Sequence, residues 1–219
     1  MPTVLITGAN RGIGLEFARQ YTADGWDVIA TARRPDDAGE LQQLGPDVLP
    51  LDAANPASIG ALAKRLAGRP IDVLIANAGV YPQGLDADEW SKAFATNCIG
   101  PTLLARALLP NVAASGERKM VATSSRMGSI ADNDSGGAIA YRSSKAALNA
   151  AWHGLAIEFR GDGVTMAVLH PGWVQTDMGG ADASIAPETS VSGLRRVIAG
   201  LSLSESGGFF AYDGEELPW

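Results

Sequence analysis

Short apolar runs alternate along the chain with longer segments in which apolar residues recur at helical spacing. The runs predict seven strands, at residues 3–7, 27–32, 47–52, 71–79, 119–125, 163–172 and 208–214. The intervening pattern predicts helices over 14–25 and 57–68, a long helical stretch over 88–109, and a helix from Tyr141. Near-continuous hydrophobic strands separated by helices indicate a parallel sheet covered on both faces. We therefore expect one doubly wound α/β domain over residues 1–219, with seven parallel strands flanked by helices.

Composition narrows the classes of function. Hydrophobic residues make up 46% and charged residues 19% of the 219 residues, which is ordinary for a protein with a sizeable core. The net charge of −7 gives no support to binding of nucleic acid or of an anionic membrane. Cys98 is the one cysteine, so no internal disulfide forms and a reducing compartment is expected. Without a signal-peptide pattern or an apolar run of ~20 residues, we expect a cytoplasmic protein.

The first predicted strand leads directly into a glycine-rich turn, "TGANRGIG", which contains Gly8, Gly12 and Gly14. Glycines at such a turn let the backbone bend sharply, let a pyrophosphate approach, and let helix and strand pack closely. The N-terminus of the following helix offers free N–H groups to phosphate. An ordinary βα turn is the alternative, but its place in the first βα unit favours a dinucleotide site.

Three motifs together resemble the short-chain dehydrogenase/reductase family. The glycine spacing is Gly-x-x-x-Gly-x-Gly, "NAG" (77–79) follows the fourth strand, and "YRSSK" (141–145) opens the helix after the fifth strand. The resemblance covers essentially the whole chain and implies a Rossmann fold. The short chain and its ending, "YDGEELPW", look most like the branch with C-factor-type and sniffer-type carbonyl reductases.

The end of the second strand indicates which dinucleotide is bound. NAD-binding enzymes commonly place an acidic residue there to hold the ribose 2′-hydroxyl. This chain has Ala32 followed by Arg33, and Arg11 lies within the glycine turn. Two guanidinium groups without a carboxylate would suit the 2′-phosphate of NADP(H). The alternative is that Arg33 and its neighbour Arg34 are solvated surface charges.

The resemblance implies further contacts to the cofactor. Asp52 would accept from the adenine amino group beside the Ala53 backbone, although Asp52 could equally cap the next helix. The remaining contacts would come from the glycine turn (Gly8, Asn10, Arg11, Gly12, Ile13, Gly14), from Asn77, Ala78 and Gly79, from Tyr141 and Lys145, and from Pro171, Gly172, Val174 and Thr176.

Reduction of a carbonyl needs a proton for the oxygen, and Tyr141 is the predicted donor. Lys145 lies four residues along the same helix, so the two side chains share a face, and its ammonium is expected to lower the phenol's pKa. The resemblance adds Ser125 as the donor to the substrate carbonyl and Asn97 as the residue that positions a water linked to the lysine. Ser124 is the alternative serine, but neighbouring strand residues point in opposite directions. A helix-surface pair is the structural alternative for Tyr141 and Lys145.

Two loops are expected to shape the substrate pocket. Ser125 and Tyr141 are sixteen residues apart, about three more than in many family members, and the extra length, 131–137, is polar. The small residues of 176–190 suggest a mobile lid, with Trp173 and Met178 as pocket walls, although core packing is equally open for Trp173. Neither histidine has a partner at metal-ligand spacing, so no metal is assigned. Cys98 fits a buried apolar residue better than a nucleophile.

The leading hypothesis is an NADPH-dependent carbonyl reductase acting on a small-molecule ketone or aldehyde. A second is an NADP-binding signalling or sensor protein of C-factor type with little turnover. A related extended-family epimerase or dehydratase is weaker, because too few residues follow Thr176 for a substrate domain. The family often pairs through the long helices after strands four and five, which implies a homodimer or homotetramer.

Overall fold

The computed structural model describes residues 1–219 and is built on one parallel sheet of seven strands in the order β3-β2-β1-β4-β5-β6-β7. Each predicted strand is present; β2 has the predicted bounds, and the other six strands are shorter than the apolar runs that predicted them. The strands are β1 (Thr3–Ile6), β2 (Asp27–Ala32), β3 (Asp47–Pro50), β4 (Val73–Ala76), β5 (Lys119–Thr123), β6 (Thr165–His170) and β7 (Gly208–Ala211).

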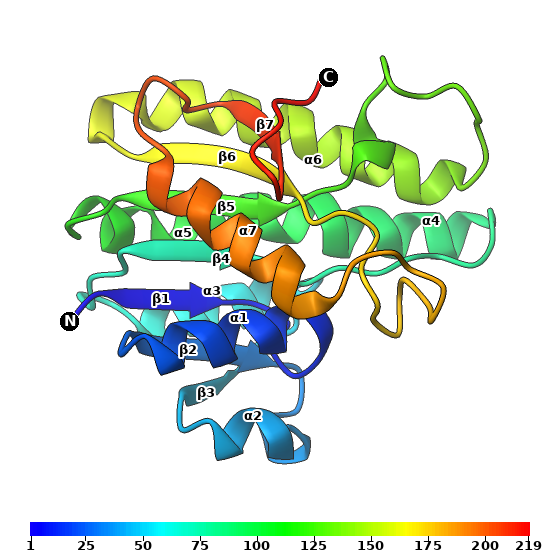
Figure 1. Ribbon diagram of the computed structural model, residues 1–219. Coiled ribbons are helices and arrows are strands. Elements are labelled where there is room, and N and C mark those ends of the chain that lie inside the picture. Colours follow the sequence, from blue (N-terminus) through cyan, green and yellow to red (C-terminus); the bar gives the residue numbers. More distant parts are fainter.

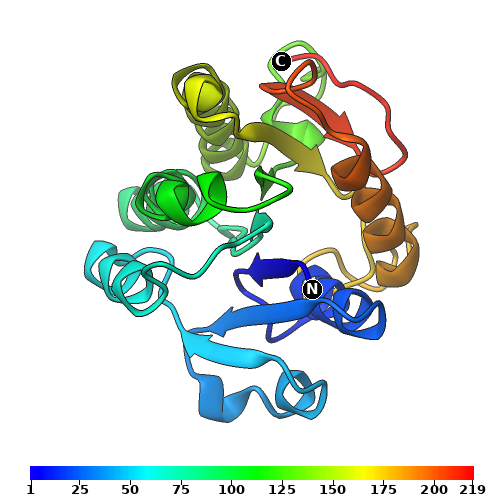
Figure 2. The ribbon, with the colours of Figure 1, turned by 90° about the vertical axis from the view of Figure 1, so that its left-hand side faces the viewer.

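Helices cover both faces of the sheet, as the doubly wound prediction requires (Figures 1 and 2). On one face, α3, α5 and α6 pack over a cluster that includes Leu74, Met120 and Trp152. On the other, α1, α2 and α7 pack over a cluster that includes Phe17 and Ile75. The α-helices are α1 (Gly12–Ala23), α2 (Gly39–Gln43), α3 (Pro56–Arg65), α4 (Ala87–Phe94), α5 (Gly100–Ala113), α6 (Ile139–Glu158) and α7 (Pro187–Gly200).

Strand β4 shows why the two cores are separate. Its residues are buried throughout, with Leu74 in one cluster and Val73 and Ile75 in the other, because side chains alternate across a strand. Both faces of the strand are apolar, and only a sheet covered on both sides removes both from water. The uninterrupted apolar runs of the sequence therefore translate directly into the layered fold.

The long helical stretch predicted over 88–109 is not one helix. It consists of α4, a π-helical turn η2 (Ala95–Ile99) that contains Asn97, and α5. At the start of α5, a side chain on Gly100 would lie 1.9 Å from the carbonyl oxygen of Ala53, so this helix approaches the loop after β3 closely. Helices α2 and α7 were not anticipated, and α7 takes up residues 187–190 of the expected lid.

Two findings concern what the fold lacks. No helix combines the length and the apolar character needed to cross a membrane. No three His, Cys, Asp or Glu side chains come together in a way that could hold a metal ion.

Candidate active site

The carboxyl ends of β1, β4, β5 and β6 meet at one edge of the sheet, on the right in Figure 1, and the predicted site residues follow these ends. In an open parallel sheet, a ligand is expected at this edge, at the point where the strand order reverses. Here β1 is flanked by β2 on one side and by β4 on the other, so the reversal lies beside β1. The glycine turn starts from that position.

The glycine turn and the "NAG" segment form one packed unit. Gly8 has φ +64°, and a Cβ there would lie 2.9 Å from the Cα of Ala78. A Cβ on Gly14 would lie 2.3 Å from the carbonyl oxygen of Gly8. The Asn77 amide donates to the Thr7 carbonyl at 3.1 Å, and the Thr7 hydroxyl accepts from the backbone N–H of Asn77 at 2.9 Å. The structure thus brings together two segments about 70 residues apart, and only glycine fits between them.

The N-terminus of α1 is open to an anionic ligand. Its N-cap residue, Arg11, makes no side-chain capping bond. The N–H groups of Gly12, Ile13 and Gly14 meet no backbone or side-chain acceptor within the protein. Free N–H groups and the positive end of the helix dipole suit a phosphate group. This part of the chain therefore fits the pyrophosphate of a dinucleotide.

Tyr141, Lys145 and Ser125 converge at the ends of β5 and α6. Tyr141 is 8% exposed and Lys145 4%, and the Lys145 ammonium lies 5.7 Å from the centre of the Tyr141 ring. Lys145 Nζ donates to the Thr123 carbonyl at 2.8 Å. The Ser125 side chain is close enough to the Tyr141 phenol to lower its pKa by hydrogen bonding. A simple helix-surface pair does not describe Tyr141 and Lys145, because both side chains are buried.

The two serines have different surroundings. The Ser124 hydroxyl donates to Asn149 Oδ1 at 2.6 Å inside the protein. The Ser125 hydroxyl accepts from the Met127 backbone N–H at 3.2 Å and keeps its own proton free to donate. The alternation along the strand therefore leaves Ser125, and not Ser124, beside Tyr141.

The expected lowering of the Tyr141 pKa by Lys145 is wrong for this structure. Burial raises the pKa of Tyr141 to about 12, against the smaller effect of the Ser125 hydrogen bond. Burial also lowers the pKa of Lys145 to about 8. The lysine directs its ammonium to the Thr123 carbonyl rather than to the phenol oxygen. Desolvation outweighs the Ser125 hydrogen bond, and the phenol is protonated at neutral pH.

Asn97 lies in the π-helical turn and is 1% exposed. Its Oδ1 accepts from the Val80 backbone N–H at 2.8 Å, and its Nδ2 donates to the Val80 carbonyl at 2.9 Å. The same Nδ2 donates to the Ser144 hydroxyl at 3.0 Å. Asn97 therefore ties the loop after β4 to α6 within the "YRSSK" motif. π-Turns occur frequently at functional sites, and here the turn brings a polar side chain into an apolar helix face.

The two arginines expected at the 2′-phosphate, Arg11 and Arg33, differ in whether they have an ion-pair partner. Arg33 is exposed and makes no hydrogen bond or ion pair, whereas Arg11 pairs with Asp177 of the loop after β6 at 2.9 Å. The role of both arginines at the 2′-phosphate stays a prediction, with Arg11 paired to a carboxylate and Arg33 unpaired. Asn10, next to Arg11 in the turn, is also exposed.

The role of Asp52 as a helix cap is wrong. Asn55 caps α3 by accepting from the Ala57 N–H. Asp52 is exposed, and its carboxylate accepts from the Ala54 N–H at 3.0 Å, which holds the turn beside Ala53. One carboxylate oxygen has no partner in the turn and remains available.

The loop after β6 begins with a tight turn. The Pro171 carbonyl accepts from the Ser190 hydroxyl at 2.6 Å, and Gly172 has φ +83° with no room for a Cβ beside Ile185. Val174 is buried and bridges to Ile185. A Cβ on Gly12 would lie 3.3 Å from Thr176, so this loop meets the glycine turn. The expected lid is therefore pinned at its base.

Trp173 and Met178 are 55% and 50% exposed, so neither packs in the core. The Trp173 indole N–H donates to the Gly179 carbonyl at 2.8 Å. Both side chains belong to the loop after β6, at the edge of the sheet where the carboxyl ends of the strands meet. Their exposure is compatible with the predicted role as walls of a substrate pocket. Cys98 is half-buried, and burial raises its pKa, as expected for a thiol that is not a nucleophile.

Tyr81 lies beside Tyr141 in the candidate site and was not predicted from the sequence. Its ring centre lies 4.6 Å from that of Tyr141, and its side chain is 37% exposed. The signal was available, since Tyr81 follows the carboxyl end of β4 by five residues. The structural roles of Thr7, Thr123 and Ser144 could not have been found in the same way, because they depend on the packing of distant segments.

Comparison with known proteins decides the family. A family model described as "short chain dehydrogenase" matches residues 2–184.

The chain belongs to the short-chain dehydrogenase family.

This short-chain dehydrogenase is 45% identical to C-signal of Myxococcus xanthus over 166 residues, which cover 73% of this chain and 99% of that protein. A carbonyl reductase from chicken fatty liver, solved with NADPH bound, matches it with a TM-score of 0.93 at 36% identity, covering 100% of this chain and 99% of that chain. The carbonyl reductase Sniffer of D. melanogaster matches with a TM-score of 0.94 at 32% identity, covering 100% of both chains. The predicted resemblance is confirmed.

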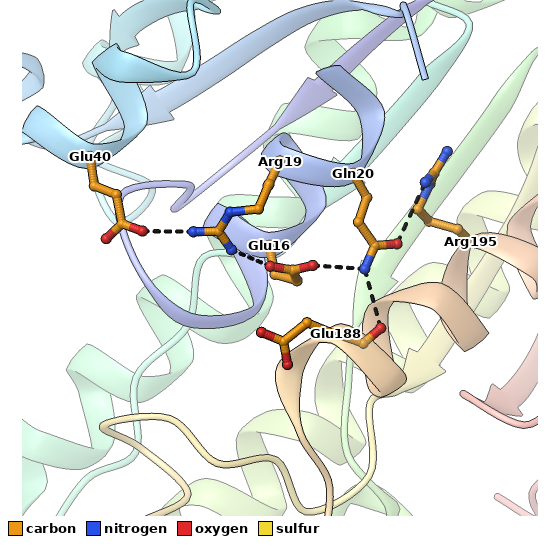
Figure 3. Close-up of polar contacts among 6 residues, drawn as sticks. All are labelled: Glu16, Arg19, Gln20, Glu40, Glu188 and Arg195. Carbon is orange, nitrogen blue, oxygen red and sulfur yellow. Dashed lines mark hydrogen bonds and ion pairs between the residues drawn. The ribbon is translucent and has the colours of Figure 1, made fainter. Parts of the chain in front are cut away.

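A polar network holds α1 of this short-chain dehydrogenase in place (Figure 3). Glu16 is 3% exposed, pairs with Arg19, and accepts from Gln20 Nε2 at 2.8 Å. Arg19 continues to Glu40 on α2 at 2.6 Å, and Gln20 donates to the Glu188 carbonyl on α7 at 3.2 Å. A cleft of about 270 Å³ lies along this flank of α1. The network fixes the helix whose N-terminus faces the expected phosphates.

Proposed function

We propose that the protein is an NADPH-dependent reductase that converts the carbonyl group of a ketone or aldehyde to an alcohol. The observation that carries this proposal is the grouping of the buried Tyr141 phenol, the Ser125 hydroxyl and the Lys145 ammonium beside the open N-terminus of α1. The likeness to carbonyl reductases, one of them solved with NADPH, supports both the reaction and the cofactor.

NADPH, when bound, supplies the hydride. Its phosphates would meet the free N–H groups of Gly12, Ile13 and Gly14, and its 2′-phosphate would meet Arg33, which has no partner of its own. Asp52 and Ala53 would face the adenine. Asn77, Ala78 and Gly79, with Pro171, Gly172, Val174 and Thr176, would line the rest of the cofactor.

The chain's own residues handle the oxygen of the carbonyl. Ser125 donates its free proton to the carbonyl oxygen and polarises it. Tyr141 delivers a proton to the same oxygen as negative charge develops there. A phenol with its pKa raised to about 12 is a weaker acid than an exposed tyrosine, yet it is still a stronger acid than an alcohol and can give its proton to the developing alkoxide.

Lys145 replaces the proton that Tyr141 gives up. With its pKa lowered to about 8, the ammonium releases a proton more readily than an exposed lysine would. Asn97 contributes by holding the Val80 loop and Ser144 around the lysine. A Cβ on Gly79 would lie 3.3 Å from Asn97 Oδ1 and 3.6 Å from Lys145 Nζ, so the two polar groups flank the same point.

We infer that the rest of the substrate, apart from its carbonyl group, is hydrophobic. Three loops that follow β4, β5 and β6 expose large hydrophobic side chains, among them Tyr81, Ile130, Trp173 and Met178. Exposed apolar groups gathered at the edge of a functional cleft mark a surface that is covered by a ligand. Among these four side chains, Tyr81 has a ring that packs against Tyr141, tilted by 43° with ring centres 4.6 Å apart.

The test is the substitution Tyr141→Phe, which removes the transferable proton and keeps the ring. We expect turnover of every carbonyl substrate to fall at least ~10²-fold, with NADPH affinity, measured by fluorescence titration, within about twofold of wild type. Tyr81→Phe is the matched control and should keep most of the activity. Near-wild-type turnover of Tyr141→Phe would refute the proposed role.

A second candidate is an NADP-binding signalling protein with little turnover, favoured by the likeness to C-signal. The complete set of Ser125, Tyr141, Lys145 and Asn97 argues for chemistry, because a binding protein has no need of a buried phenol beside a lysine. Measuring NADPH oxidation against ketones, aldehydes and quinones separates the two. Tight NADPH binding without turnover of any of them would support the signalling role.

We also propose a cytoplasmic homodimer or homotetramer. Support comes from α4, η2, α5 and α6, which expose Trp90, Ile99, Leu103 and Ile157 to 36%, 50%, 38% and 67%, respectively. Light scattering on the purified protein tests the assembly, and a monomeric mass would refute it.

A further inference from the structure

One ion pair joins the glycine turn to the loop after β6. Arg11 Nη1 donates to Asp177 Oδ2 at 2.9 Å, and the two residues are 166 positions apart in the sequence. Thr176, the residue before Asp177, lies against Gly12, the first residue of α1. The Asp177 carboxylate is therefore held beside a helix N-terminus, where a negative charge is favourable and where the phosphates of a dinucleotide would bind.

The loop around Asp177 is a tight turn with its own hydrogen bonds. The Gly180 N–H donates to the Thr176 carbonyl at 2.8 Å, and the Gly179 N–H donates to the Thr176 hydroxyl at 3.2 Å. Gly180 closes the turn with a φ of +81°. Because these bonds enclose Asp177, the turn fixes the backbone from which its carboxylate reaches Arg11.

The ion pair is specific to these two residues. The cleft of about 270 Å³ along α1 is lined by two cations, Arg11 and Arg19. Arg19 is already paired with Glu16 and with Glu40, as Figure 3 shows. Arg11 is therefore the cation of this cleft that is left for Asp177. The two side chains are 64% and 77% exposed, so the pair is weak enough for a ligand to open it.

The glycine turn and the end of β2 extend from one hydrogen-bonded point. The Ala9 N–H donates to the Thr31 carbonyl at 2.9 Å. Arg11 lies two residues beyond Ala9, Arg33 lies two residues beyond Thr31, and both arginines are exposed. A phosphate group between these neighbouring segments would have two guanidinium donors. Arg33 is free to donate, whereas Arg11 must first leave its carboxylate.

This inference rests on the proposed binding of NADPH. We propose that Asp177 is a specificity-determining residue of the cofactor site, because its carboxylate competes with the 2′-phosphate for Arg11. NADPH carries this phosphate and reaches Arg11 only by displacing Asp177. NADH has a hydroxyl group there and leaves the ion pair intact. Asp177 thus weakens the binding of NADPH and not that of NADH, and it assists the release of NADP⁺.

The test compares Asp177→Asn with wild type, since asparagine keeps the shape of the side chain and removes its charge. Affinities for NADPH and NADH are measured by fluorescence titration at low ionic strength, where exposed ion pairs are screened least. Asp182→Asn is the matched control, because Asp182 is an exposed carboxylate of the same loop without an ion-pair partner. Arg11→Met, alone and combined with Asp177→Asn, completes a double-mutant cycle.

We expect Asp177→Asn to bind NADPH about two- to fivefold more tightly, since an exposed ion pair shifts an equilibrium by about that factor. Its affinity for NADH should equal that of wild type. Arg11→Met should bind NADPH more weakly, and in that background Asp177→Asn should change nothing. Asp182→Asn should bind both nucleotides as wild type does.

Three outcomes would overturn the inference. In the first, Asp177→Asn binds NADPH no more tightly than wild type does. In the second, the affinities for NADPH and NADH rise equally, so that Asp177 acts only through its general charge. In the third, the gain persists in Arg11→Met. The proposed function fails separately, if the protein binds NADPH and reduces no carbonyl compound; the affinities then still decide the role of Asp177. Absence of NADPH binding in every variant would refute both.

Discussion

Replacing Lys145 by methionine should stabilise the cofactor-free protein while abolishing its activity. The ammonium of Lys145 is buried, and burial lowers its pKa from 10.5 to about 8. The folded protein thus binds this proton more weakly than the unfolded chain does. At ~1.36 kcal/mol per pKa unit, the shift corresponds to about 3 kcal/mol of destabilisation at neutral pH. Methionine has a similar length and carries no charge.

The sign of the pH dependence follows from proton binding. Below pH 8, both states of the wild-type protein carry the proton and the full penalty applies. Between pH 8 and 10.5, the unfolded chain binds more protons than the folded state, so wild-type stability rises with pH. Methionine does not titrate. The difference in unfolding free energy between Lys145→Met and wild type should therefore fall by about 3 kcal/mol across this window.

The hydrogen bond from Lys145 to the Thr123 carbonyl, at 2.8 Å, reduces the gain at neutral pH. Its loss costs about 1–2 kcal/mol, which leaves a net stabilisation of about 1–2 kcal/mol and an increase in Tm of roughly 2–8 °C. Urea unfolding followed by circular dichroism between pH 7 and 10.5 measures both quantities. Lys64→Met, at an exposed position of α3, is the control and should show no such trend. A difference that stays flat over this pH range would refute the account of the buried ammonium.

The remaining predictions concern the two serines and the ribose end of the cofactor. Ser125→Ala should lower kcat ~10²–10³-fold without weakening NADPH binding, because it removes the hydroxyl proposed to donate to the carbonyl oxygen; retained kcat in steady-state assays would contradict this. Ser124→Ala should instead lower stability by about 1–3 kcal/mol in urea unfolding, since Asn149 Oδ1 is left buried without its donor, and an unchanged midpoint would count against it. Arg33→Ala should weaken NADPH binding on the order of tenfold and NADH binding little, as measured by fluorescence titration. An equal loss of affinity for NADPH and NADH would refute the assignment of Arg33 to the 2′-phosphate.

The fold was predictable because its information is local. The inner strands β1 and β4 are apolar runs buried on both faces, and the helices between the strands carry a one-sided pattern. The exceptions also have physical reasons. The π-turn at Asn97 depends on bonds to Val80 and Ser144, which are distant in sequence. The helix α7 has few apolar residues, and its burial against α1 becomes visible only once the sheet is assembled.

The sequence was sufficient to predict which side chains come together in the candidate site. It was not sufficient to predict how burial shifts their pKa values. The motifs placed Tyr141, Lys145 and Ser125 together because each follows a strand end, and strand ends of a parallel sheet share one edge. The direction of the Tyr141 pKa shift could not be obtained in that way. It depends on how much water the surroundings exclude, and on the Thr123 carbonyl that draws the lysine away. Arg11 is a similar case, because its partner Asp177 lies 166 residues away.

The interior place of β1 in the sheet affects how the chain can fold during its synthesis. Strand β1 pairs with β2, but its other neighbour is β4, with Val4 opposite Val73. Until the ribosome has released that later segment, one edge of a buried and largely apolar strand remains without a partner. An exposed apolar strand edge readily pairs with other chains. We therefore expect nascent chains that end between β2 and β4 to aggregate and to require a chaperone, whereas chains that extend beyond β4 close this edge themselves.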